Sequence, residues 1–366
     1  VELATSNVTR GIPPAFSLPS QKEAFLRFAR AHPEKYWVQK SNKHRGIKIT
    51  GVEELDLSQD NSFIQEYIAR PLLIDKRKFD IGIYTVVTSV KPLRVYVYDG
   101  DAILRFCPAE YHPFDPSNVD KYVVGPLARY YTEQEFSFKE SLNAHLWSQG
   151  QDPQKPWKAM KETIAEVLMA KALQFQPLVQ KYRFPGAFFE LSRFDFVLDD
   201  ELNVYLMEAN MSPNLASGHF PPNRLIYEQV LFNLFSVTGV ADPLLTAPLQ
   251  RSSEEQEMQA SDKDIAVYAT ECASATCQGC GGGELMCKLC KQCRSPELRQ
   301  ALRGAFLEHV NRRNTRRVVP PPLTLEMARD SNSLANSLKH KGASEDDVLM
   351  TLWFAGKCLL DVTWCN

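Results

Sequence analysis

The stretch from Phe188 to Asn210 constrains the fold more than any other part of the chain. Apolar and other residues alternate up to Leu198, a polar run follows at 199–203, and the alternation resumes at Val204. Period-two alternation on both sides of a short polar run predicts a β-hairpin. A four-residue loop at 200–203 would pair position 199 with 204, 197 with 206 and 195 with 208.

This register places Asp195 directly opposite Glu208, with Asn210 on the same face of the hairpin. Two facing carboxylates repel each other unless a cation lies between them. Carboxylate and amide oxygens are the ligands that a hard cation such as Mg²⁺ prefers. A solvated acidic face is the alternative interpretation. The Phe, Val, Leu, Tyr and Met residues around these positions predict buried strands and favour the metal site.

Length and charge exclude several classes of protein. The chain has 366 residues, enough for a large core and more than one domain. A formal net charge of −2 and a sequence pI of about 6.4 argue against a nucleic-acid-binding protein. We expect no membrane span, because no run approaches the length of an apolar transmembrane helix. The chain begins with Val1, so we expect an upstream segment to have been removed or left out.

A basic segment near the start of the chain could cradle a phosphate. A strand-like run delivers Lys40, and a short basic loop with Arg45, Gly46 and Lys48 follows. The lysine would supply a point charge and the loop would supply backbone N–H groups. A plain hairpin with a basic turn is the alternative.

Two further strand-like runs carry polar residues in regular positions. An apolar run that contains Gln65 and Ile68 ends at a proline turn. The next run alternates strongly and places Lys78, Asp80 and Gly82 on one face.

The motifs at residues 194–199 (Phe-Asp-Phe-Val-Leu-Asp) and 207–213 (Met-Glu-Ala-Asn-Met-Ser-Pro) resemble the metal-binding strands of the tubulin–tyrosine ligase-like proteins. These proteins are ATP-grasp amino-acid ligases. The resemblance covers roughly residues 12–240 and implies an α/β fold of the ATP-grasp type, with mixed and antiparallel sheets and flanking helices. It also implies ATP and Mg²⁺ as cofactors, with Asp195, Glu208 and Asn210 as the metal ligands.

The resemblance implies further site residues by position. The nucleotide-binding set is Lys40, Arg45, Gly46, Lys48, Gln65, Ile68 and Lys78, and the catalytic set is Lys78, Asp80 and Arg105. Lys48 stands where the family usually has a second glycine.

Two positions depart from the family pattern. The motif Lys-Phe-Asp-Ile-Arg reads Lys-Phe-Asp-Ile-Gly here, so that Gly82 replaces an arginine that points at the phosphates and the acceptor. Lys121 replaces an asparagine, whereas the neighbouring Tyr122 matches. Both changes fall where the γ-phosphate and the incoming amino acid should meet.

Two functions therefore stay open. The first is a ligase in which ATP phosphorylates a protein carboxylate and an amino acid, glutamate by family habit, attacks the acyl phosphate. The acceptor would be an acidic protein tail, with tubulin the usual one in the family. The alternative is a catalytically impaired pseudoligase that binds a nucleotide or a partner.

The C-terminal part of the sequence predicts a separate module. We expect a ligase-like domain at 1–245, a linker at 246–270 and a small, cysteine-rich, mainly helical module at 271–366. Helices are expected at 296–317, which is rich in arginine, and at 345–360. The module holds eight of the nine cysteines, namely Cys272, Cys277, Cys280, Cys287, Cys290, Cys293, Cys358 and Cys365.

The eight cysteines have two interpretations. An even number favours four disulfides, and Zn²⁺ binding by the Cys-x-x-Cys pairs is the minority alternative. Disulfides, together with a glycosylation sequon at Asn7, favour the lumen of the secretory pathway or the extracellular space. The family resemblance favours the cytoplasm and the cytoskeleton instead.

Overall fold

The computed structural model describes residues 1–5, 11–41, 48–124, 136–179, 181–182, 188–218, 221–240, 257–280 and 285–366. The chain forms two compact units. The first comprises Val1–Tyr84, Asp101–Ala170 and Ser192–Tyr227, and the second comprises Thr85–Gly100, Lys171–Leu191 and Glu228–Asn366. These boundaries differ from the division at residues 245 and 271 that the sequence predicts, because each unit is assembled from three separate stretches of chain.

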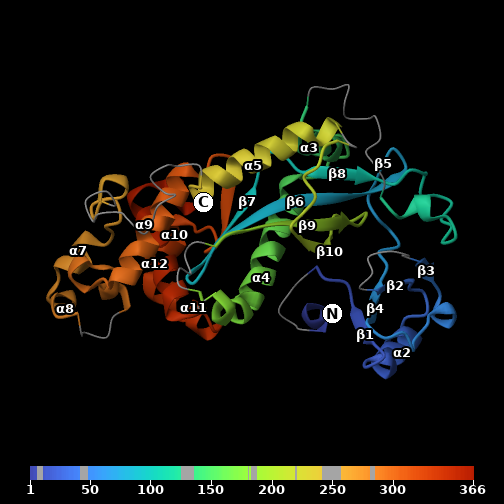
Figure 1. Ribbon diagram of the computed structural model, residues 1–366, viewed down its shortest axis with the longest axis horizontal. Helices are drawn as coiled ribbons and strands as arrows, with labels where there is room; N and C mark the ends of the chain where they lie inside the picture. The colour runs from blue at the N-terminus through green and yellow to red at the C-terminus, as the bar shows by residue number, and fades with distance from the viewer. Residues whose placement is uncertain are drawn as a thin grey trace. The chain divides into compact units, whose positions relative to one another are not determined.

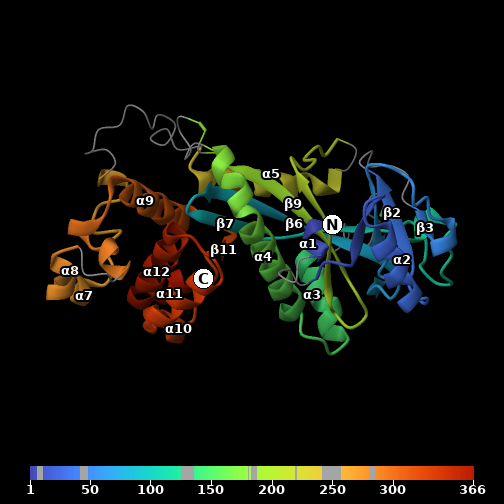
Figure 2. The same ribbon diagram turned by 90° about the horizontal axis from the view of Figure 1, so that it is seen from below.

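The first unit contains a four-stranded antiparallel sheet with the order β1-β4-β2-β3. Its strands are β1 (Ala15–Leu18), β2 (Trp37–Ser41), β3 (Lys48–Thr50) and β4 (Ser62–Glu66). The short helix α1 (Glu2–Thr5) and the helix α2 (Lys22–Ala31) belong to the same unit. Figures 1 and 2 both show α2 against this sheet, where Phe25 packs with Trp37 and Ile64 in a buried cluster.

The second sheet is built around the long strand β6 (Arg77–Val90). The hydrogen-bonded order is β10-β9-β6-β7-β11, and β5 (Leu73–Ile74) and β8 (Ile103–Phe106) also pair with β6. β9 (Glu190–Leu198) and β10 (Val204–Met211) form the predicted hairpin. Helices α3 (Phe138–Ser148) and α4 (Gln154–Val179) lie between β8 and β9 in the chain. The antiparallel sheets with flanking helices confirm the predicted fold class.

The second unit joins the C-terminal residues to a strand from the first hundred residues. β11 (Thr315–Val319) pairs antiparallel with β7 (Leu93–Tyr98). Arg94 on β7 forms a buried two-bond ion pair with Glu308, with nitrogen–oxygen distances of 2.8 and 2.9 Å. Helix α5 (Arg224–Thr238) adds Leu234 and Val237 to a core with Val86 and Tyr96. The mainly helical, cysteine-rich C-terminal residues therefore share a unit with β7.

The C-terminal helices pack around α12 (Glu345–Leu360). They are α9 (Pro296–Asn311), α10 (Leu325–Arg329) and α11 (Ser331–His340), drawn in orange and red in Figure 1. Residues 348–356 of α12 are all buried, as expected of a helix that is apolar on every side. Ser344 caps the helix by accepting a hydrogen bond from the Asp347 N–H. The helix predicted at 345–360 is confirmed.

The prediction of one helix over 296–317 is wrong in its last part. Helix α9 ends at Asn311, and Arg316 and Arg317 lie on β11. Arg317 is fully buried and donates to the carbonyl oxygens of Pro321 and Trp364. The sequence predicts a helix here, but β11 is held by its pairing with β7, which the local sequence does not reveal.

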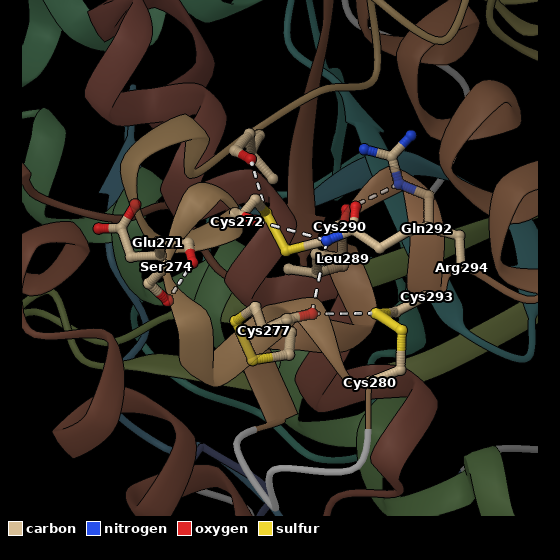
Figure 3. The surroundings of a disulfide bond; sticks show 12 residues. Glu271, Cys272, Ser274, Cys277, Cys280, Leu289, Cys290, Gln292, Cys293 and Arg294 are labelled. Carbon is tan, nitrogen blue, oxygen red and sulfur yellow. Dashed lines mark hydrogen bonds between the residues drawn. A yellow bond between two sulfur atoms is a disulfide. The ribbon is translucent and has the colours of Figure 1, made fainter.

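The eight C-terminal cysteines form four disulfides, which confirms that prediction. The bonds join Cys272 to Cys290, Cys277 to Cys287, Cys280 to Cys293 and Cys358 to Cys365. Figure 3 shows Gln292 among the first three bonds, and its amide donates to the carbonyl oxygens of Cys272 and Cys277. Short helices α7 (Ala269–Ala273) and α8 (Ala275–Gln278) carry two of the cysteines.

The Zn²⁺ alternative is not supported. All eight sulfur atoms are bonded in pairs, and the described residues contain no group of three or more His, Cys, Asp or Glu side chains placed to hold a metal ion. Cys107, which directly follows β8, is a buried free thiol.

Among the described residues, no helix is both long and apolar enough to cross a membrane.

Intact mass gives a test of the disulfide framework. Reduction should raise the mass by about 8 Da, two hydrogens for each of the four disulfides. The variant Cys107→Ser should keep this difference, because Cys107 is the free thiol. A variant that lacks both Cys358 and Cys365 should show about 6 Da, since one of the four bonds is gone. An unchanged mass on reduction would contradict the framework.

A buried histidine in the second unit makes stability depend on pH. His309 stacks on Trp364 with ring centroids 3.6 Å apart. Its pKa is lowered to about 3, mainly by burial and also by the positive charges of Arg312, Arg317 and Lys357, while Asp361 opposes the shift. Because the folded pKa lies below the usual value near 6.5, the neutral form stabilises the fold above pH 6.5. That contribution is lost as the pH falls from about 6.5 towards 3.

We therefore predict that the free energy of unfolding decreases in this pH range more steeply for the wild type than for His309→Phe. Phenylalanine keeps the stacking on Trp364 and has no proton to gain. Urea denaturation at a series of pH values measures the difference. Parallel curves for the two proteins would show that His309 does not take up a proton on unfolding.

Candidate functional site

The β9–β10 hairpin brings two predicted metal ligands face to face. Asp195 pairs with Glu208, as the sequence predicts. The predicted pairs of 199 with 204 and 197 with 206 are wrong by one residue, because Leu198 pairs with Val204. A bulge between Leu206 and Glu208 corrects this offset, since it inserts one extra residue into β10.

The same register adds an arginine to this face. Asn210 pairs with Arg193, which lies two residues before Asp195 on β9. Side chains two positions apart on a strand share a face, and so do directly opposed cross-strand pairs. Arg193 and Asp195 therefore lie on the same face as Glu208 and Asn210.

The Asp195 carboxylate is almost completely buried and is held by three side chains. Arg193 contacts both of its oxygens, with Nε 2.7 Å from Oδ1 and Nη2 3.0 Å from Oδ2. Arg105 Nη2 lies 2.9 Å from Oδ2, and Asn210 Nδ2 donates to the same oxygen at 2.8 Å. Among the described residues, Oδ1 accepts from Arg193 alone and keeps a second lone pair for a further ligand.

A second buried carboxylate lies on the neighbouring strand. Asp80 on β6 pairs directly with Arg105 on β8. Two hydrogen bonds of 2.8 and 2.6 Å join the guanidinium to the carboxylate. Burial raises the pKa of Asp80, and the Arg105 guanidinium opposes that shift. Arg105 thus bridges Asp80 and Asp195, and two of the three predicted catalytic residues are in direct contact.

Lys78, the third predicted catalytic residue, is a buried cation near these groups. Its Nζ donates to the carbonyl oxygen of Tyr122 at 3.1 Å and lies 5.5 Å from the centre of the Tyr67 ring. Burial lowers the pKa of Lys78, and the nearby Cys107 and Asp80 oppose the shift. Such a desolvated ammonium is an effective partner for an anionic ligand, because little water has to be displaced from it.

Lys40 reaches the site from the four-stranded sheet. Its Nζ donates to Gln65 Oε1 at 2.9 Å, so that β2 and β4 together present these two predicted nucleotide-binding residues. Burial lowers the pKa of Lys40, the Glu208 carboxylate raises it and Lys78 lowers it. Glu208 and Lys78 therefore both lie close enough to Lys40 to act on its charge.

For the remaining predicted site residues, the structure describes fewer contacts. Arg45 and Gly46 lie outside the described residues, and for Lys48 only the backbone, on β3, is described. Ile68 is buried just after β4. Lys121 donates from Nζ to the carbonyl oxygen of Pro113 at 2.6 Å. The roles of all these residues in binding and catalysis stay predictions.

Sequence reasoning missed Arg193. Two signals could have found it: its position two residues before Asp195 on a predicted strand, and the glycine at position 82, which leaves room on the adjacent strand.

The donor set of the hairpin fits a divalent cation. Asp195 Oδ1 has a lone pair to share, Glu208 is exposed on the same face, and Asn210 has a carbonyl oxygen besides the amide that it directs at Asp195. Oxygen ligands of this kind suit Mg²⁺. The lysines and arginines around them suit an anion that carries several negative charges, such as a nucleoside triphosphate.

Comparison with known proteins identifies the family. The family model described as "Tubulin-tyrosine ligase family" matches residues 3–246. A relative from Caenorhabditis elegans named "Probable tubulin polyglutamylase ttll-15" is 43% identical, over 100% of this chain and 71% of its own length. The human "Tubulin monoglutamylase TTLL4" is 25% identical over 72% of this chain and 24% of its own length. The mouse "Tubulin polyglutamylase TTLL6" is 27% identical over 56% of this chain and 27% of its own length.

The chain thus spans about a quarter of the length of the human and mouse relatives and most of the length of the nematode relative. The family model alone covers more than half of the chain, and its range includes every predicted site residue. The chain therefore belongs to the tubulin-tyrosine ligase family of ATP-grasp ligases, which form amide bonds.

Proposed function

We propose that this protein binds ATP with Mg²⁺ and joins glutamate to a carboxylate of an acidic protein tail. The observation that carries the proposal is the cluster of Asp80, Arg105, Asp195 and Asn210, in which two buried carboxylates and a shared guanidinium lie beside an amide. Relatives that are named tubulin glutamylases support glutamate as the amino acid and tubulin as the acceptor.

In this proposal, Asp195, Glu208 and Asn210 would hold the metal ion, which offsets the charge on the phosphates when it is bound. Lys40 and Lys78 would contact phosphate oxygens, because both ammonium groups are largely buried and face the acidic side chains of the site. Arg105 would keep Asp80 and Asp195 in place during the reaction. The acceptor carboxylate would be activated as an acyl phosphate, and the amine of glutamate would displace the phosphate to form the amide.

The identity of the acceptor protein and the cellular compartment of this protein have to agree with each other. A tubulin acceptor favours the cytoplasmic and cytoskeletal alternative, which agrees with the names of the relatives. The secretory or extracellular expectation depends on the four disulfides and on Asn7, which lies outside the described residues. We propose tubulin as the first acceptor to test, because the names of the relatives bear on it directly.

A pseudoligase is the second candidate function. It is favoured by Gly82, which brings no side chain to the site from β6, and by Lys121, whose ammonium bonds to Pro113. In that case the same cluster would bind a nucleotide without transferring its phosphate.

The first prediction concerns nucleotide binding. Glu208→Gln should raise the Kd for Mg-ATP by about tenfold or more, because loss of one carboxylate ligand weakens the metal site. Titration calorimetry on the purified chain measures this. Glu201→Gln is the matched control, since Glu201 is an exposed residue in the loop of the same hairpin and pairs with Arg70. Absence of binding by the wild type would rule out both candidate functions that use a nucleotide.

The second prediction separates the ligase from the pseudoligase. With ATP, Mg²⁺, tubulin and labelled glutamate, the wild type should incorporate label and Asp195→Asn should not, because the amide removes the charge that Arg193 and Arg105 balance. Asp200→Asn, in the hairpin loop, is the matched control and should retain incorporation. Binding of Mg-ATP by a wild type that incorporates no label would favour the pseudoligase.

A further inference from the structure

The space beside Gly82 is filled by an arginine from the next strand. Gly82 lies on β6 and Arg193 on β9, which are neighbours in the sheet. A Cβ atom added at Gly82 would lie 3.0 Å from Arg193 Cδ, 3.4 Å from Arg193 Nε and 3.2 Å from Asp195 Oδ1. Any larger side chain at position 82 would therefore need the space that the Arg193 side chain occupies.

We infer that Arg193 is a positioning residue of this site: placed in the space that Gly82 leaves, it fixes the Asp195 carboxylate for the metal ion and the nucleotide. The inference rests on the proposed function, since it assigns a role to Arg193 within the same site. The guanidinium that the family resemblance expects at position 82 is thus supplied from the adjacent strand.

The hydrogen bonds of Arg193 explain how it would fix Asp195. Nε and Nη2 bind the two carboxylate oxygens at 2.7 and 3.0 Å, so that the planar fork sets both the position and the plane of the carboxylate. Arg105 and Asn210 add two further contacts, both to Oδ2. The arrangement therefore holds the carboxylate in one orientation and leaves Oδ1 able to bind a metal ion.

The charge balance of the cluster also requires Arg193. The side chain of Asp195 is 3% exposed and those of Asp80, Arg193 and Arg105 are 12%, 11% and 26% exposed. Two carboxylates and two guanidiniums have a formal sum of zero. Removal of Arg193 would leave Arg105 as the one guanidinium in contact with both buried carboxylates, which is unfavourable. A lysine could restore the charge but could not bind both oxygens in the same plane.

A reciprocal exchange of the two residues tests the inference. The proteins are the wild type, Arg193→Gly, Gly82→Arg and the double variant with both changes. The readouts are the Kd for Mg-ATP, the dependence of ATP binding on Mg²⁺ concentration, and the melting temperature without ligand. Arg193→Lys tests whether charge alone is enough, and Arg70→Gly, which removes an exposed arginine, is the control for net charge.

We expect Arg193→Gly to raise the Kd for Mg-ATP by about tenfold or more and to shift the Mg²⁺ dependence to higher concentration. Arg193→Lys should resemble Arg193→Gly in its Mg²⁺ dependence. Gly82→Arg should lower the melting temperature, because two guanidiniums compete for one space. The double variant should return to within about threefold of the wild-type Kd, because the arginine introduced at position 82 then supplies the guanidinium from β6.

Two outcomes would overturn the inference. In the first, Arg193→Gly has the same Kd for Mg-ATP and the same Mg²⁺ dependence as the wild type. In the second, the double variant binds Mg-ATP no better than Arg193→Gly. If Gly82→Arg does not fold, the Kd values of Arg193→Gly and of the double variant still test the inference. A wild type that does not bind Mg-ATP refutes the proposed function itself, whereas binding that is insensitive to Arg193 refutes the inference alone.

Discussion

Two carboxylates buried in one β-sheet are the constraint on which the site depends. Asp80 and Asp195 come from neighbouring strands, and each carboxylate is hydrogen-bonded to a guanidinium, because buried charges are costly unless they are paired. Arg105 serves both carboxylates and Arg193 serves one, so the formal charges cancel inside the sheet. Glu208 on the same hairpin is exposed, and its carboxylate raises the pKa of Lys40.

In the second unit, buried charged side chains are also paired with groups of opposite charge or with hydrogen-bond acceptors. The ion pair of Arg94 with Glu308 joins β7 to α9, and Arg317 is buried against backbone carbonyl oxygens and the ring of Phe354. Charged residues from the C-terminal segment are thus built into the same core as a strand from early in the chain. The four disulfides add cross-links within that unit.

The hairpin shows how far local reasoning reaches. Alternation predicted β9 and β10, and it predicted that Asp195 faces Glu208, because side chains on a strand repeat every two residues. The same reasoning placed two other pairs one residue out, since a bulge is not visible in an apolar–polar pattern. Asp195 and Glu208 therefore face each other as predicted, although the pairs between the bulge and the hairpin loop differ from the prediction by one residue.

The residues that can carry the chemistry are visible in the amino-acid sequence: they are the lysines, the two aspartates, Glu208 and Asn210, at positions set by the period of their strands and typical of a ligase family. How these residues are paired follows from the three-dimensional fold. From the sequence, Gly82 indicates the loss of a cation. In the structure β6 and β9 are neighbours, and Arg193 from β9 fills the space beside Gly82. From the sequence, the residues of β11 are predicted to end a helix, but in the structure they pair with β7. In both cases the deciding neighbour is distant in sequence, and contacts between distant strands leave no local pattern.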